Sequence, residues 1–380
     1  MKDDLKDKAA KGILKAEEKL DALTFKLKRR LGLLQPLQIV PYRSYGTENR
    51  LYVKGRVLVD KGITQSEEDD TTWENLLNMY RRFESDEIPN ARVQLYLQQT
   101  THEITTDQEG YFELNIEPQR PLQPDDIWHA IDLKLVDAPV KITEEVTATA
   151  HVLVPPPDAE YGIISDIDDT IIRTGSTSLL ETGRNVLLHN AHTRIPFHGV
   201  SQFYKALQLG RNGKRNNPFF YVSSSPWNNY DLLYHFLELN DIPQGPLLLR
   251  DFGIDEKKFL KSDHMSHKYK EIGNILATYP KLNFILIGDS GQLDADIYHQ
   301  VVHNFPGRIM AIYIRDVNIA KRTQAVTTIA DELKQEGEVE LVLVKNTTAA
   351  ADHAAQNGFI FTEQVQHVEN EAELDEEGDV

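Results

Sequence analysis

The residues of this chain best suited to chemistry are two aspartates, Asp166 and Asp168, which lie two positions apart directly after an apolar run at residues 161–165. A run of this length and β-branched composition is typical of a buried parallel strand, and such sheets bind ligands beyond the carboxyl ends of their strands. One carboxylate there can attack phosphorus, while the other exchanges protons with the leaving group and then with water. Taken alone, the same spacing is equally compatible with acids that cap a following helix.

Three further features follow in an order that tests the idea of phosphoryl transfer. A second apolar run, residues 218–222, ends at Ser223, whose hydroxyl and backbone N–H can donate to a phosphoryl group. Lys268 lies near the start of a predicted helix, where its ammonium group can neutralise phosphoryl charge. A third run, residues 282–288, ends at Asp289, a natural ligand for Mg²⁺. Each feature alone also has an ordinary structural explanation as a strand end, a solvated helix end or a turn.

In combination, these features resemble the four motifs of the haloacid dehalogenase superfamily, a doubly wound α/β fold whose members are mostly magnesium-dependent phosphohydrolases. The strings SDIDDTI, YVSSSPWNNY, HKYKEI and IGDSGQLDADIY are similar to the catalytic domain of the actin-patch-associated phosphatidate phosphatases and, more distantly, to the lipin phosphatases. The resemblance covers residues 155–320 strongly and the upstream region more loosely.

The resemblance implies a role for each matching residue. Asp166 would be the nucleophile that becomes an aspartyl phosphate, and Asp168 would be the general acid and base. Thr170 would orient the loop between them. Ser223 would hydrogen-bond the transferring phosphoryl group, and Lys268 would bridge that group to the nucleophile.

The resemblance also implies a Mg²⁺ cofactor. Its ligands would be Asp166, the backbone carbonyl of Asp168, and Asp289, because Mg²⁺ prefers oxygen ligands and bridges to phosphate oxygens. Asp294 is a further candidate, which would reach the metal through water or orient Lys268. A plain helix-capping role for Asp294 is equally compatible with the sequence.

An insertion at about residues 174–199 separates the aspartates from the next predicted helix, residues 200–209. In this superfamily, insertions at this place form caps that select the substrate. Arg194 and His198 lie in the insertion and are candidates for binding a phosphate or a headgroup. Ser224, next to the predicted phosphoryl-binding serine, is the third candidate substrate-binding residue.

The pattern of elements predicts a haloacid dehalogenase-like, doubly wound parallel sheet over residues 158–360, because strands and helices alternate there. Short β-branched or alternating runs predict a small β-sandwich-like domain over residues 37–157, with a helical insertion at 72–82. The last segment, residues 361–380, is acidic, and its composition predicts a disordered tail.

The first 34 residues carry ten Lys and Arg against six Asp and Glu, although the whole chain has a net charge of −18. Leucine and isoleucine recur there every seven residues, which predicts an amphipathic helix over residues 1–36. Such a helix packs on its own domain, pairs with a second copy, or binds an anionic membrane surface reversibly. The sequence leaves these interpretations open.

Composition excludes several classes of protein. The chain of 380 residues has no cysteine, which rules out disulfides and cysteine-type zinc sites. Its negative charge argues against general nucleic-acid binding, which needs clustered cations. The sequence has neither a signal-like apolar region near its first residues nor an apolar stretch long enough for a membrane span. We therefore expect a cytoplasmic protein, with possible peripheral contact at a membrane.

The leading prediction is a Mg²⁺-dependent phosphatidate phosphatase, which would convert phosphatidate to diacylglycerol and phosphate. The residues themselves indicate only phosphoryl transfer, and the resemblance supplies the substrate. A phosphatase acting on a soluble phosphomonoester or a phosphoprotein is nearly as compatible with the sequence. A non-catalytic phosphatidate-binding module is the third alternative, although the chain has every acid and the lysine that catalysis would need.

Overall fold

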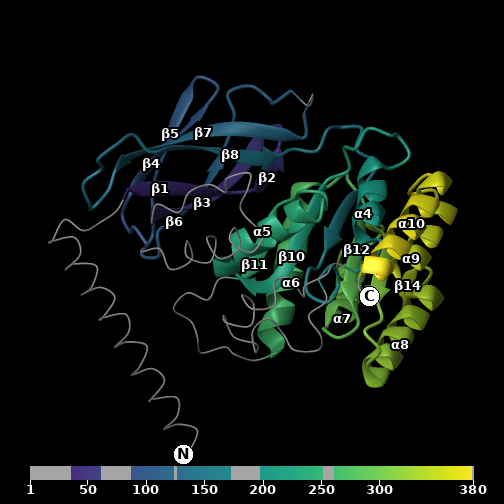
Figure 1. Cartoon of the computed structure of the whole chain (residues 1–380). Coiled ribbons are helices and arrows are strands. Elements are labelled where there is room, and N and C mark those ends of the chain that lie inside the picture. The colour runs from purple at the N-terminus through teal and green to yellow at the C-terminus, as the bar shows by residue number, and fades with distance from the viewer. Residues whose placement is uncertain (1–35, 61–86, 124–125, 173–196, 251–260, 379–380) are drawn as a thin grey trace, which may run out of the picture.

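The computed structural model describes residues 36–60, 87–123, 126–172, 197–250 and 261–378 (Figure 1). The predicted N-terminal helix, the helical insertion at 72–82, Arg194 and most of the predicted cap fall outside these ranges. Among the helices that the structure describes, none is both long enough and apolar enough to cross a lipid bilayer.

The strands that follow residue 160 form one six-stranded sheet in the order β11-β10-β9-β12-β13-β14, and every neighbouring pair is parallel. The strands are β9 (Gly162–Ser165), β10 (Phe219–Pro226), β11 (Leu247–Arg250), β12 (Phe284–Asp289), β13 (Ile309–Arg315) and β14 (Leu341–Val344). The strand order reverses between β9 and β12. In open parallel sheets, ligands bind beyond the carboxyl ends of the strands at such a reversal.

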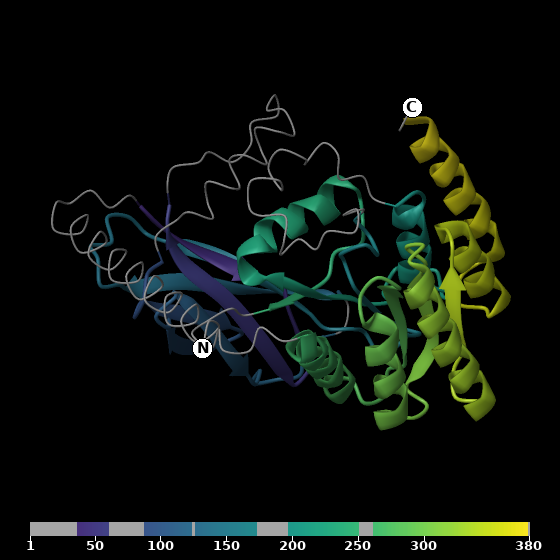
Figure 2. The same cartoon turned by 90° about the horizontal axis from the view of Figure 1, so that it is seen from below.

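Helices cover both faces of this sheet, as Figure 2 shows. They are α4 (Val200–Leu209), α5 (Tyr230–Leu239), α6 (Lys261–Thr278), α7 (Asp294–Asn304), α8 (Ala320–Glu336), α9 (Thr347–Gln356) and α10 (Thr362–Gly378), with a short 3₁₀ helix, η2 (Trp227–Asn229), before α5. Alternate side chains of a strand point to opposite faces. In β12, for example, Ile285 and Ile287 pack with α4, α5, α9 and α10, whereas Phe284 and Leu286 pack with α6, α7 and α8. The predicted doubly wound arrangement is therefore observed.

The upstream strands form a second, mostly antiparallel assembly, which Figure 1 shows at the other end of the molecule from α8, α9 and α10. They are β1 (Leu37–Tyr42), β2 (Ser44–Thr47), β3 (Arg50–Val59), β4 (Arg92–Leu97), β5 (Thr100–Thr105), β6 (Tyr111–Ile116), β7 (Trp128–Asp137) and β8 (Thr147–Leu153). Inward side chains of β3 and β6 meet those of β4, β7 and β8 in a single core. The predicted sandwich is thus present in part, since β2 pairs with both β3 and β8 and links the two layers.

Aromatic residues join the two assemblies. Tyr45 of β2 packs edge-on against Phe220 of β10, with 5.7 Å between ring centroids, and lies 6.3 Å from Tyr279 after α6. The Tyr279 hydroxyl also donates a hydrogen bond of 2.9 Å to the Gly46 carbonyl. The strand that carries Ser223 and the helix that carries Lys268 are therefore both anchored to the upstream strands.

The structure corrects two expectations. The C-terminal segment is not disordered over residues 362–378 but forms α10, because Val365 and Val368 face the core and offset the cost of ordering an acidic chain. Lys268 lies in the interior of α6, which begins earlier than predicted, at Lys261.

Candidate active site

A tight turn after β9 holds the paired aspartates. The backbone N–H of Asp166 donates to the Ile287 carbonyl of β12, which extends the strand pairing by one residue. The backbone N–H groups of Ile171 and Ile172 both return to the Ile167 carbonyl. Asp169 has φ 54°, a left-handed conformation that aspartate adopts more readily than most residues. The chain reverses here and keeps its carboxylates at the end of the sheet.

Lys268 lies at the centre of the site, with 2% of its surface exposed. Its Nζ is 2.9 Å from Asp166 Oδ1 and 2.6 Å from Asp294 Oδ1, and it donates a hydrogen bond of 3.2 Å to Gln292 Oε1. Burial alone would lower the pKa of Lys268, but the carboxylates of Asp166 and Asp294 raise it above its usual value. The lysine is therefore a fixed positive charge between two acids from different elements.

Asp289, the last residue of β12, completes a buried acidic cluster. Single carboxylate oxygens of Asp166, Asp289 and Asp294 lie within 4.8 Å of one another. Asp289 Oδ1 accepts hydrogen bonds from the backbone N–H groups of Gly291, at 2.6 Å, and Gln292, at 2.9 Å. Its Oδ2 is buried and has no hydrogen-bond partner among the residues that the structure describes. This oxygen is therefore available to a ligand.

The cluster holds more negative charge than Lys268 can balance. Burial raises the pKa of Asp166 well above its usual range, and Lys268 only partly opposes this effect. Burial and the neighbouring Asp294 carboxylate raise the pKa of Asp289 to about 8. The arrangement therefore favours a bound proton or a bound cation beside Asp289.

Ser223 and Ser225 hold the second acid of the pair. Their hydroxyl groups donate to the same oxygen, Oδ2 of Asp168, at 3.1 and 3.2 Å. The Ser225 backbone N–H donates in turn to Ser223 Oγ at 2.9 Å. Ser224 lies between them in β10 and is buried. Since strand side chains alternate, Ser224 is expected on the opposite face, and its predicted contact with substrate stays a prediction.

The structure places the remaining predicted residues in different surroundings. Thr170 is buried beside the aspartates, and its hydroxyl has no hydrogen-bond partner among the described residues. His198 Nδ1 lies 3.6 Å from Glu376 Oε1 of α10. The backbone N–H of Phe197, within the predicted cap range, donates to the Ile171 carbonyl of the aspartate turn at 3.0 Å.

Gln292 is a site residue for which the sequence predicted no role. Its Nε2 donates to Asp166 Oδ2 at 3.4 Å and to the Asp168 carbonyl at 3.3 Å, while its Oε1 accepts from Lys268. It thus contacts three predicted catalytic groups at once. The only sequence signal was its place between the two acids of the string DSGQLD.

Known proteins share this segment. Residues 161–316 match the family model described as phosphatidate phosphatase APP1, catalytic domain. Phosphatidate phosphatase APP1 of Saccharomyces cerevisiae is 38% identical over 155 residues, which are 40% of this chain and 25% of the yeast protein. An uncharacterized protein of Schizosaccharomyces pombe is 29% identical over 160 residues, 41% of this chain and 25% of that protein.

The chain spans about a quarter of the length of these relatives. Among solved structures, a carbohydrate acetylesterase from Xanthomonas citri aligns with 76% of this chain and 72% of its own, at 9% identity and a TM-score of 0.25. A score this low does not indicate a shared fold. The sequence matches confirm the resemblance that the motifs predicted, since residues 161–316 are similar to the catalytic domain of phosphatidate phosphatase APP1.

Proposed function

We propose that this chain is a Mg²⁺-dependent phosphatidate phosphatase that acts through an aspartyl phosphate on Asp166. The observation that carries the proposal is the buried contact between Asp166 and Lys268, 2.9 Å apart, at the point where the strand order reverses. A nucleophilic carboxylate beside a fixed positive charge suits transfer of a phosphoryl group. The match of residues 161–316 to the APP1 catalytic domain supports phosphatidate as the substrate.

The same proposal includes a haloacid dehalogenase-like fold for the parallel sheet. Its support is the strand order together with the order of the site residues along the chain. The nucleophile candidate Asp166 follows β9, Ser223 lies in β10, Lys268 lies in α6, and Asp289 ends β12. These are the positions at which the resemblance expects its four motifs.

In the first half of the reaction, an oxygen of Asp166 bonds to phosphorus as the bond between phosphorus and the glycerol oxygen breaks. Asp168 gives its proton to that oxygen, and diacylglycerol leaves. In the second half, a water oxygen attacks phosphorus and gives a proton to Asp168, and the bond to Asp166 breaks to release phosphate. Ser223 and Ser225 orient the Asp168 carboxyl group, and Lys268 neutralises charge on the phosphoryl oxygens.

The donor set fits Mg²⁺. All candidate ligand atoms are oxygens, namely carboxylate oxygens of Asp166 and Asp289 and the Asp168 carbonyl, with Asp294 close by. The buried Oδ2 of Asp289, which has no hydrogen-bond partner in the described part of the chain, is the specific atom that a cation would satisfy. When bound, the ion supplies positive charge that stabilises the phosphoryl oxygens in the transition state.

The test is phosphate release from phosphatidate in mixed micelles, measured beside a panel of soluble phosphomonoesters, with Mg²⁺ or with a chelator. Asp168→Ala removes the acid and base, and Asp352→Asn, on the exposed face of α9, is the matched control. We expect Mg²⁺-dependent release from phosphatidate that Asp168→Ala abolishes and Asp352→Asn preserves.

Other outcomes would support one of the two alternative functions. Turnover of soluble esters alone would retain the chemistry but contradict the lipid substrate. Phosphatidate binding without turnover of any ester would contradict the enzyme and support a binding module.

A further inference from the structure

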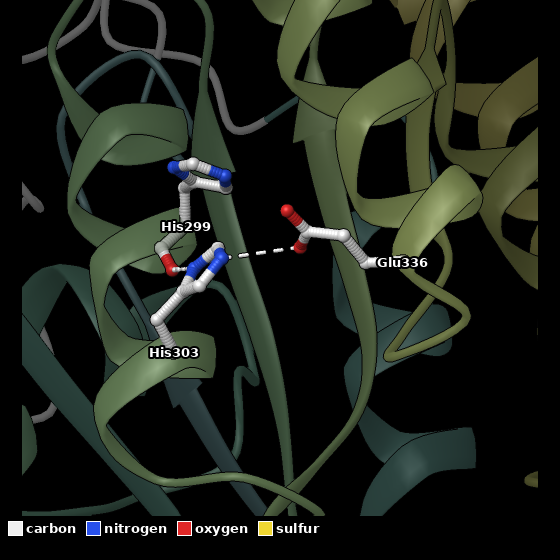
Figure 3. A group of neighbouring side chains, drawn as sticks. All are labelled: His299, His303 and Glu336. Carbon is white, nitrogen blue, oxygen red and sulfur yellow. Dashed lines mark hydrogen bonds and ion pairs between the residues drawn. The ribbon is translucent and has the colours of Figure 1, made fainter.

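A second cluster of potential metal ligands lies outside the acidic site, on helices α7 and α8 (Figure 3). His299 and His303 are four residues apart on α7, so both rings project from one face of the helix. Glu336, the last residue of α8, faces them, as Figure 3 shows. One ligand atom from each of the three residues lies within 4.8 Å of the others.

The hydrogen bonds of His303 indicate which of its nitrogens is available. Its Nδ1 lies 2.8 Å from the backbone carbonyl of His299, and because a carbonyl oxygen only accepts, Nδ1 must carry a proton. In the neutral ring, Nε2 then has a lone pair, and it faces Glu336 Oε2 at 3.1 Å. Two acceptors that face each other require a cation between them, either a proton on the ring or a metal ion.

His299 has a ring nitrogen without a hydrogen-bond partner in the described part of the chain. Its Nε2 is shielded from solvent and makes no hydrogen bond with any residue that the structure describes. The nearest acid is Glu332 of α8, whose Oε2 lies 3.7 Å away, beyond hydrogen-bond distance. The two imidazole rings are 4.4 Å apart between centroids.

We propose that His299, His303 and Glu336 bind a Zn²⁺-type divalent cation that links α7 to α8. Two imidazoles and a carboxylate are ligands that zinc accepts, with metal–ligand bonds of about 2.0–2.2 Å. Tetrahedral bonds of that length separate neighbouring ligand atoms by about 3.3 Å, close to the 3.1 Å between His303 Nε2 and Glu336 Oε2. Water completes the coordination, since His303 and Glu336 are 44% and 42% exposed.

The histidine cluster differs from the acidic site in that two of its ligand atoms are nitrogens. Mg²⁺ favours oxygen, whereas imidazole suits zinc and its neighbours in the transition series. His299 is five residues from Asp294, the first residue of α7, which corresponds to about 8 Å along the helix axis. The metal would therefore stabilise the packing of α7 on α8 and take no part in phosphoryl transfer.

The test uses the purified chain of 380 residues, stripped with a chelator and titrated with Co²⁺ to give a visible spectrum and then with competing Zn²⁺. We expect one equivalent of Co²⁺ to give the strong bands of a tetrahedral site, whereas Co²⁺ held by the oxygen ligands of the acidic cluster absorbs weakly. His299→Gln and His303→Gln should each weaken Zn²⁺ binding by at least about tenfold, because loss of even an outer partner of a metal ligand costs that much.

Two controls locate the metal. His353→Gln removes a histidine that is also paired with a glutamate, Glu340, at 3.0 Å, and Asp289→Asn removes an acid of the other cluster. Neither change should alter the Co²⁺ spectrum. A spectrum that persists in His303→Gln, or that disappears in Asp289→Asn, would overturn the proposal.

Thermal unfolding gives an independent measurement. A ligand that binds only the folded state raises the unfolding midpoint. Zn²⁺ should therefore raise the midpoint of the wild type and of His353→Gln but not of His303→Gln, with folding of each variant checked by circular dichroism. Equal rises in all three proteins would contradict a site at the histidine pair.

Discussion

At the scale of single residues, the site depends on one lysine that compensates two buried acids. Lys268 contacts Asp166 and Asp294, and all three side chains are almost fully buried. Buried charges are tolerated only when they are paired and hydrogen-bonded. The lysine therefore has two roles, since it neutralises the acids in the folded protein and the phosphoryl group during the proposed reaction.

Lys268→Met removes that charge. We expect kcat/KM for phosphate release to fall by about 10²–10³-fold, the usual effect of losing one group that stabilises transition-state charge. Loss of one partner of a buried pair should also destabilise the fold by about 3–5 kcal/mol. Lys270→Met, on the exposed side of the same helix, should change neither value. Steady-state kinetics and urea unfolding measure both, and a Lys268→Met protein with normal turnover would contradict the assigned role.

From the sequence, candidate site residues could be predicted where they lie in, or directly follow, a strand or helix with a clear apolar pattern. Asp166, Ser223 and Asp289 were predicted because each lies at or near the end of an apolar strand, where a parallel sheet gathers ligands. Ser225 and Gln292 were not, because their contacts depend on how β10 packs beside the aspartate turn and how the loop after β12 folds back. Neither contact has a local sequence signature.

At the scale of elements, charged side chains from distant segments form hydrogen bonds with backbone groups of helix ends and loops. Glu371 and Asp375 of α10 accept hydrogen bonds from the backbone N–H groups of Gln202 and Gly199, each at 2.9 Å, at the start of α4. Such N–H groups lack partners within their own helix and attract negative charge. Two of the acidic residues whose abundance predicted disorder thus cap the start of α4. Composition alone does not reveal this role.

Arg322 of α8 holds the loop between Asp289 and Asp294. It donates to the Ser290 carbonyl at 3.1 Å, to the Gln292 carbonyl, and to Asp296 at 3.1 Å. These bonds fix the segment that presents Asp289 and Gln292 to the site. Within the described part of the chain, no hydrogen bond or ion pair joins the arginine side chain to Asp166, Asp289 or Asp294.

Arg322→Gln should therefore affect the reaction only by changing the position of the loop that carries Asp289 and Gln292. We expect a loss of about 1–3 kcal/mol in the free energy of unfolding, from carbonyls left without their donors, and a lower kcat. Lys321→Gln, which changes an exposed neighbour on α8, is the control. If Arg322→Gln lowered stability while kcat and the Mg²⁺ requirement stayed at wild-type values, the loop would not need this support.

At the scale of the whole molecule, the two assemblies share a buried aromatic junction. Tyr45, Phe220 and Tyr279 pack together across it, and the Tyr279 hydroxyl bonds to the upstream backbone. The junction involves β10 and the end of α6, both of which carry site residues. The domain boundaries predicted from sequence remain a prediction, and we expect the two assemblies to unfold together.

Tyr279→Phe tests this coupling. It leaves the buried Gly46 carbonyl without its donor, which should cost about 1–3 kcal/mol. Hydrogen exchange in increasing denaturant should show β4 and β12 losing protection together, both at lower denaturant than in the wild type. Tyr96→Phe, at an exposed tyrosine, should leave both transitions unchanged. A shift in only one of the two strands would show that the assemblies unfold independently.

The central claim is that the carboxylate of Asp166 attacks phosphorus. The most direct measurement is a rapid acid quench of the protein during turnover of phosphatidate with Mg²⁺, followed by mass spectrometry of the peptide that contains Asp166. The account predicts a transient phosphoryl group on Asp166 that forms and decays at rates consistent with phosphate release and that is absent in Asp166→Asn. Phosphate release by Asp166→Asn at the wild-type rate, or a phosphoryl group on a different residue, would contradict it.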